Sequence, residues 1–143
     1  MREILFRGKR CYNGEWVYGN LVVDKNDKPH IVPKDYFYED GHHLQYYDDT
    51  DKPVFLDPET VGQFTGLTDK NGTKIFEGDI LEGVDYDEEY GFGIVTWYDG
   101  AFWIENGSWC GTFCENYNAT AFEVIGNIHD NPELIGGADN EKQ

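Results

Sequence analysis

Short apolar segments separated by turn residues are the dominant pattern of this chain. Turn clusters recur about every ten residues, whereas apolar residues spaced three and four apart, as on one helix face, are nearly absent. Short strands at such regular spacing are typical of antiparallel sheets and small barrels. The pattern therefore predicts an all-β fold with at most one short helical turn, at residues 131–134, where Asn can cap and Pro suits the first helical position.

The first part of the chain is predicted to form antiparallel hairpins. Asn13-Gly14 tolerates positive φ at both positions and predicts a two-residue hairpin turn, and Asn26-Asp27 predicts another turn. An irregular excursion rich in Tyr and Asp follows at residues 33–58. The predicted strands cover residues 4–12, 15–23 and 30–32, with a weaker candidate at 44–47.

Residues 59–81 contain three turn signals between short apolar segments. Asp69 stands where a type I turn starts, and Gly72 stands where the chain needs positive φ. Gly78 predicts a bulge or sharp bend, and Asp79 is placed to cap the backbone before the next strand. The predicted turn and bend need these residue types for their backbone conformations, so we interpret the residues as structural rather than catalytic.

The second half of the chain predicts a small closed sheet. Asp99-Gly100 is a second tight hairpin turn. Together with one strand of the preceding hairpin, the predicted strands cover residues 80–82, 92–98, 101–105 and 122–128, and residues 106–118 are expected to be irregular. Closure into an SH3-like small β-barrel removes exposed strand edges. We expect N-terminal hairpins over residues 1–58 packed against this barrel at residues 59–135, with a disordered tail at 136–143.

Charge and composition narrow the class of protein. The chain has 143 residues and a net charge of −17, from 28 acidic and 11 basic residues. Such a charge repels phosphate backbones unless a local basic patch exists, so a nucleic-acid partner is not favoured. The three cysteines, the absence of a signal peptide and the absence of an apolar run of roughly 20 residues predict a reducing, cytoplasmic setting without a membrane segment.

Six segments together resemble the YopX family of small phage and prophage proteins. They are FRGK (6–9), GEWVYG (14–19), ETVGQFTGL (59–67), DKNG (69–72), IFEGDI (75–80) and VIGNIHDNPEL (124–134). The resemblance implies a β-rich protein that is encoded by a phage and resides in the bacterial host cytoplasm. It carries over no catalytic residue, so the catalytic residues are unknown, and no cofactor or metal site is expected.

Several residue groups are candidates for chemistry, each with a structural alternative. The acidic residues of 83–90 could bind a hard cation, but a solvated loop is favoured. A zinc site from two cysteines and two histidines is disfavoured, because its spacing is loose. His129 and Asp130 are expected to close a turn rather than form a catalytic pair. The acidic group is Asp85, Asp87, Glu88 and Glu89. The group considered for zinc is Cys110, Cys114, His42 and His43.

Two further groups suggest binding. Basic residues concentrate near the N-terminus and could touch an acidic partner or another subunit, but a polar strand face is favoured. Aromatic residues concentrate around the second tight hairpin, where core or protein-interface use is favoured over base stacking. The basic group is Arg2, Arg7, Lys9 and Arg10. The aromatic group is Trp97, Tyr98, Phe102, Trp103 and Trp109.

These observations favour a non-catalytic binding protein. High aromatic content and strong negative charge favour a protein partner of the host or phage, with a homo-oligomer as one form. The first alternative is a metal-dependent hydrolase that uses Asp79, Asp85, Asp87 or nearby Glu residues around Mg²⁺. The second alternative is a nucleic-acid binder that uses the basic N-terminal strand and the aromatic hairpin.

Overall fold

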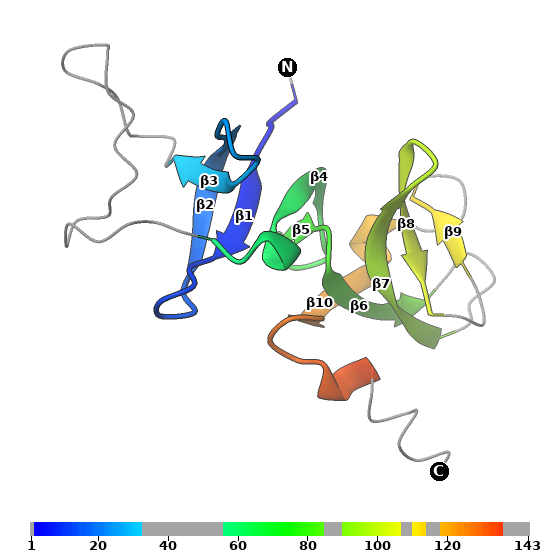
Figure 1. Ribbon diagram of the computed structural model, residues 1–143. Coiled ribbons are helices and arrows are strands. Elements are labelled where there is room, and N and C mark those ends of the chain that lie inside the picture. Colours follow the sequence, from blue (N-terminus) through cyan, green and yellow to red (C-terminus); the bar gives the residue numbers. More distant parts are fainter. Residues whose placement is uncertain (1, 33–55, 85–89, 107–109, 114–117, 136–143) are drawn as a thin grey trace. The chain divides into compact units, whose positions relative to one another are not determined.

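The computed structural model describes residues 2–32, 56–84, 90–106, 110–113 and 118–135 (Figure 1). The strands are β1 (Phe6–Lys9), β2 (Trp16–Val23), β3 (Pro29–Val32), β4 (Gly62–Thr68), β5 (Lys74–Phe76), β6 (Asp79–Val84), β7 (Tyr90–Tyr98), β8 (Ala101–Glu105), β9 (Cys110–Thr112) and β10 (Phe122–Asn127). Two 3-10 turns are η1 (Pro58–Thr60) and η2 (Ala119–Ala121). The strands form two five-stranded antiparallel sheets, in the orders β3-β2-β1-β4-β5 and β10-β6-β7-β8-β9. The prediction of an all-β fold is confirmed.

The chain divides into two compact units, residues 1–63 and 64–143, and each is described by itself. Strand β4 begins in the first unit, where it pairs with β1, and continues into the second, where it pairs with β5. The predicted domain bounds at residues 58 and 135 stay predictions. The weak strand at 44–47 and the tail at 136–143 lie outside the described residues.

The first unit is a set of hairpins around a small apolar core. Ile31 and Leu56 are its buried centre, with Phe6, Val17, Leu21 and Val61 packed against them. Gly8 lets Leu56 lie over β1, since a Cβ there would come within 3.1 Å of the Leu56 Cδ1 atom. A larger residue at position 8 would therefore displace Leu56.

The loop between β1 and β2 is longer than predicted. Arg10 N–H donates to the Glu15 carbonyl at 2.9 Å, which leaves four residues, 11–14, in the loop. Gly14 takes a φ of 71°, and the Asn13 side chain accepts from Glu15 N–H at 3.0 Å. The predicted two-residue turn is wrong. The ladder ends at the Arg10–Glu15 pair, and four residues rather than two lie between these partners.

The second unit contains the larger core. Its buried residues are Ile75, Leu81, Val95, Ile104, Ala119 and Phe122. Two glycines allow backbones and side chains to meet there: a Cβ on Gly93 would lie 2.6 Å from the Ile104 Cγ2 atom, and one on Gly83 would meet the Ala121 carbonyl oxygen. These positions need glycine for space rather than for positive φ.

The structure corrects part of the predicted second half. The β4–β5 hairpin belongs to the other sheet, and β9 supplies the fifth strand of this one, so residues 106–118 are not wholly irregular as predicted. Closure into an SH3-like barrel stays a prediction. The helical turn is confirmed, since Leu134 N–H donates to the Asn131 carbonyl at 3.0 Å. None of the helical segments in the described chain has the length and apolar character needed to cross a membrane.

Candidate interaction surface

The β7–β8 hairpin is the most distinctive surface feature among the described residues. Asp99 and Gly100 form its predicted tight turn, with φ values of 49° and 79°. The register places Trp97 opposite Phe102 and Thr96 opposite Trp103. Since successive side chains alternate between the two faces of a strand, the hairpin carries aromatic residues on both faces.

One face of this hairpin begins in the core and ends in solvent. Val95 and Ile104 pair on it and are buried. Further toward the turn, Trp97 contacts Phe102 edge to face at 4.8 Å between ring centroids. Trp97 is nevertheless 54% exposed, so the row of apolar side chains on this face continues from the core into solvent.

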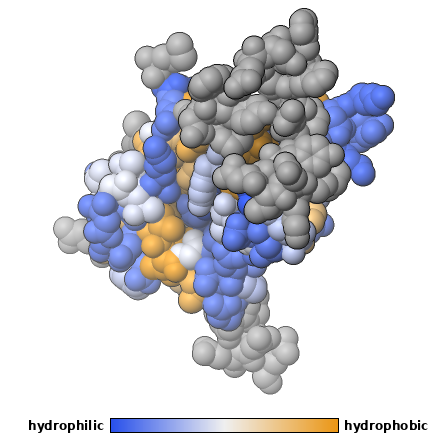
Figure 2. Space-filling model, turned by 90° about the vertical axis from the view of Figure 1, so that its left-hand side faces the viewer, coloured by the Kyte–Doolittle hydropathy of each residue, from blue (hydrophilic) through white to orange (hydrophobic). Residues whose placement is uncertain are grey.

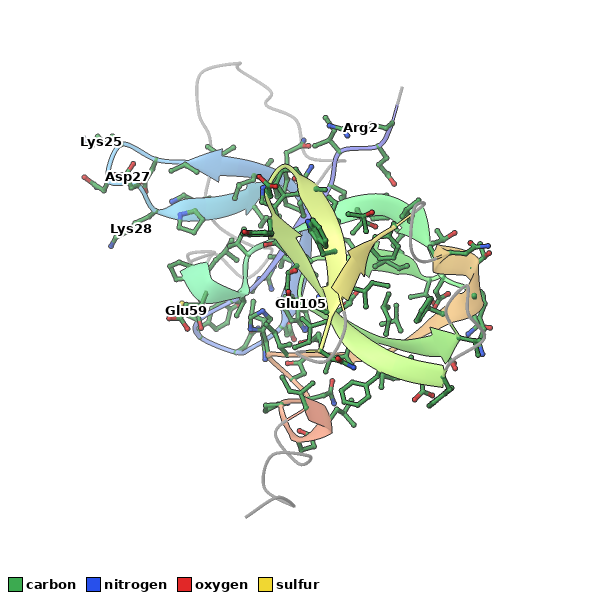
Figure 3. All side chains as sticks on the ribbon, turned by 90° about the vertical axis from the view of Figure 1, so that its right-hand side faces the viewer. Arg2, Lys25, Asp27, Lys28, Glu59 and Glu105 are labelled. Carbon is green, nitrogen blue, oxygen red and sulfur yellow. The ribbon has the colours of Figure 1, made fainter. Side chains whose placement is uncertain are left out.

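The opposite face, which we call the outer face, carries Tyr98, Trp103 and Glu105. The Tyr98 and Trp103 rings meet at 6.1 Å with an interplanar angle of 62°. The Trp103 Nε1–H donates to the Tyr98 carbonyl at 2.8 Å, which holds the indole in one orientation. Tyr98 is 67% exposed, and Figure 3 shows Glu105 on this hairpin.

The unit that carries these rings is strongly acidic. Residues 64–143 contain 16 acidic residues against three lysines, and no lysine or arginine occurs between residues 75 and 141. Lys70 pairs with Glu123 at 3.6 Å, and Lys74 lies 5.4 Å from the centre of the Phe64 ring. Within the described chain, the side chains of Asp99 and Glu105 have neither a hydrogen bond nor an ion pair.

The basic residues near the N-terminus differ in their surroundings, and two of them lie beside one aromatic ring. Arg7 is only 6% exposed, and its guanidinium lies 4.6 Å from the centre of the Trp16 ring. The Lys9 ammonium lies 5.8 Å from the same ring, and Arg10 pairs with Glu15 at 3.3 Å. Figure 2, which looks from the left-hand side of Figure 1, shows a mainly hydrophilic face interrupted by small hydrophobic areas.

Asp69, singled out in the sequence, connects the β4–β5 turn to β10. Its Oδ1 accepts from the backbone N–H groups of Asn71 and Thr73, and its Oδ2 accepts from Val124 N–H at 2.9 Å. Burial opposes ionisation, but these donors and nearby Lys70 outweigh it, so the pKa of Asp69 is lowered. The carboxylate is therefore a structural clamp, as its interpretation from the sequence requires.

The Gly78-Asp79 pair is also structural. Gly78 has a φ of 91°, its N–H donates to the Val95 carbonyl, and its carbonyl accepts from Ile128 N–H. Asp79 is buried, and its Oδ2 accepts from Phe76 N–H at 2.7 Å. The predicted bend and cap are both present.

Asn127 organises the turn that contains His129 and Asp130. Its Oδ1 accepts from the backbone N–H groups of both residues, at 3.0 and 2.9 Å. Its amide donates to the Asp130 carboxylate at 3.2 Å. These bonds support the turn-closing interpretation of the pair.

One polar pair was missed by the sequence reasoning. The His30 Nε2 lies 2.9 Å from the Asp24 Oδ2, and His30 is 2% exposed. Asp24 Oδ1 also accepts from the backbone N–H groups of Asn26 and Lys28. The bond with His30 has the largest effect on the pKa of Asp24, and together with the two backbone bonds it lowers this pKa to about 2. The signal was an Asp and a His on either side of the Asn26-Asp27 turn.

The remaining candidates fall outside the described residues. They are the side chain of Cys110 and residues His42, His43, Asp85, Asp87, Glu88, Glu89, Trp109 and Cys114. In the part of the chain that the structure describes, no three His, Cys, Asp or Glu residues cluster as metal ligands. Cys11 is an exposed free thiol.

The fold and surface define an acidic all-β protein with two five-stranded antiparallel sheets and an aromatic hairpin. The family model described as YopX protein matches residues 5–136, and the chain therefore belongs to the YopX family. Its fold is similar to the crystal structure of protein EF1440 from Enterococcus faecalis, with a TM-score of 0.52 and 25% identity over 94% of this chain and 99% of that one. No curated protein matches the chain.

Proposed function

We propose that this protein is a non-catalytic binding protein of phage origin that engages a basic protein of the host or phage in the bacterial cytoplasm. The observation that carries the proposal is the β7–β8 hairpin: exposed Trp97 and Tyr98 stand in a segment of 67 residues, 75–141, without lysine or arginine. Aromatic residues dominate the binding energy of many protein interfaces. Surrounding negative charge steers a basic partner and rejects an acidic one.

The two alternative functions have less support. A hydrolase using Asp79 would need that carboxylate at a metal, but Asp79 is buried and accepts from Phe76 N–H. A nucleic-acid site needs a basic groove. Arg7 and Lys9 instead lie against Trp16, and Arg10 is paired with Glu15.

The proposal is tested by capture from a host lysate with the full chain immobilised. Capture at about 50 mM salt, followed by elution at about 500 mM salt, exploits the shorter reach of charges at high ionic strength. The expected result is a specific protein of high isoelectric point, which is then purified and measured by calorimetry. The absence of any specific protein under either condition contradicts the proposal.

A variant identifies the part of the surface that acts. Trp97→Ser combined with Tyr98→Ser removes both exposed rings from the hairpin, and we expect the purified partner to bind at least about tenfold more weakly. The matched control is Tyr90→Ser, since Tyr90 is a comparably exposed aromatic residue, at 68%, on the same strand but at its other end. If Tyr90→Ser weakens partner binding equally, the β7–β8 turn end is not the binding surface.

A further inference from the structure

We infer that the outer face of the β7–β8 hairpin, formed by Tyr98, Trp103 and Glu105, binds an arginine side chain of the partner together with the adjacent turn residue Asp99. This inference rests on the proposed function, because it names the chemistry that the aromatic hairpin recognises. The site takes a guanidinium from another molecule, presented by a basic, extended segment of polypeptide.

The first observation is a contrast within the protein itself. In the first unit, the Trp16 ring already has two cations beside it, from Arg7 at 4.6 Å and Lys9 at 5.8 Å. In the described part of the second unit, no cation lies over Trp97, Tyr98 or Trp103. The hairpin rings therefore have the electron-rich faces that attract a cation, without one supplied by the described part of this unit.

The second observation is the geometry of the outer pair. Tyr98 and Trp103 stand at 62°, so their faces form a corner rather than a flat surface. The bond from Trp103 Nε1–H to the Tyr98 carbonyl ties the indole to the backbone of the opposite strand. A cation entering this corner meets an indole that is already oriented, which reduces the entropy lost on binding.

The third observation concerns two carboxylates that lie close to these rings in the sequence. Glu105 lies two residues after Trp103 on β8, so strand alternation places both on the outer face. Asp99 follows Tyr98 directly in the turn. Neither side chain has a hydrogen-bond or ion-pair partner among the described residues. An incoming cation can therefore stack on a ring and donate to a carboxylate without displacing an existing base.

Arginine fits this combination better than lysine. A guanidinium is planar, stacks on an aromatic face and can donate two parallel hydrogen bonds to one carboxylate. A lysine ammonium is a compact, strongly hydrated charge that gains less from stacking. The site thus predicts selectivity for arginine at equal charge.

The experiment uses the full chain and two labelled peptides, one alternating arginine with glycine and the other alternating lysine with glycine, at the same length and charge. Fluorescence anisotropy gives both affinities. The expected result is at least about threefold tighter binding of the arginine peptide, as one stacked guanidinium predicts. Equal affinities, or no binding of the arginine peptide, overturn the inference.

Three variants localise the contact. Tyr98→Ser and Glu105→Gln are each expected to weaken the arginine peptide about three- to fivefold and to reduce its advantage over the lysine peptide. Tyr90→Ser is the matched control, since Tyr90 is a comparably exposed ring, at 68%, at the other end of β7. Equal weakening by Tyr98→Ser and Tyr90→Ser overturns the inference, and thermal unfolding of each variant verifies that it is folded.

The inference and the proposed function fail separately. If the two peptides bind equally while the lysate partner still binds in a salt-dependent manner, the arginine site is wrong and the binding function stands. If the lysate yields no partner, the binding function fails whatever the peptides do.

Discussion

Replacing Asp69 by Asn tests whether the most distinctive stretch of the sequence is structural. The carboxylate accepts two bonds inside its own turn through Oδ1 and one from Val124 N–H through Oδ2. An Asn side chain has one acceptor oxygen and one donor nitrogen, so it can keep the turn bonds or the Val124 bond but not both. If the Asn oxygen accepts the turn bonds, the Asn amide nitrogen lies against the Val124 N–H, and two donors then face each other.

The expected loss of stability follows from these bonds. A hydrogen bond to a charged acceptor contributes about 1.5–3 kcal/mol. The turn donors of Asn71 and Thr73 belong to exposed residues, where water replaces a weakened bond, whereas Val124 is half-buried. We therefore expect the Asp69→Asn variant to lower the free energy of unfolding by about 2 kcal/mol, mostly through the Val124 bond.

Urea unfolding at neutral pH, followed by tryptophan fluorescence and circular dichroism, measures this change. The matched control is Asp99→Asn, which removes a carboxylate without a side-chain partner in the described chain and is expected to change stability by less than about 0.5 kcal/mol. Equal stability of the Asp69→Asn variant and the wild type would refute the clamp.

The same variant has a signature in its pH dependence. Because the folded-state pKa of Asp69 is lowered from 3.8, its contribution is fully present above that value. The contribution is lost as the pH falls through the folded-state pKa. The wild type therefore loses more stability than the variant on acidification, and parallel acid profiles would contradict the assignment.

Two further predictions address the two units. Gly93→Ala places a Cβ 2.6 Å from the Ile104 Cγ2 atom and is expected to lower the free energy of unfolding by about 1–3 kcal/mol. In the control, Gly72→Ala, the added Cβ meets no atom within 4 Å, so this variant measures the cost of positive φ alone. An equal loss of stability in both variants would exclude crowding as the cause at Gly93. The pKa of Asp24 is lowered to about 2, so its contribution is present above pH 3.8 and is lost as the pH falls toward 2. Asp24→Asn should flatten the acid unfolding profile of the first unit over that range, and an unchanged profile would contradict the Asp24–His30 pair.

The sequence predicted best where the backbone itself selects the residue. Asp99-Gly100 and Gly72 take positive φ as expected, because few other residues adopt that region without strain. Asn13-Gly14 had the same signal but a different outcome. The length of a hairpin loop depends on where the strand ladder ends, and here the Arg10–Glu15 pair ends it.

Long-range contacts account for most of what could not be predicted. The bond between Asp69 and Val124 joins residues 55 apart, and no local pattern at either position indicates it. Strand β9 has three residues, too few to show alternation. The burial of Arg7 against Trp16 likewise depends on the register of β1 on β2, so a sequence count of basic residues could not show that Arg7 is buried.

The central claim is that the β7–β8 hairpin is where this acidic protein contacts its partner. The four tryptophans give four indole N–H signals in a ¹H–¹⁵N spectrum, which Trp→Phe variants assign. On addition of the unlabelled basic protein purified from the lysate, we expect the Trp97 and Trp103 signals to shift and the Trp16 signal to stay in place. A shift of Trp16 with Trp97 and Trp103 unchanged would contradict the account.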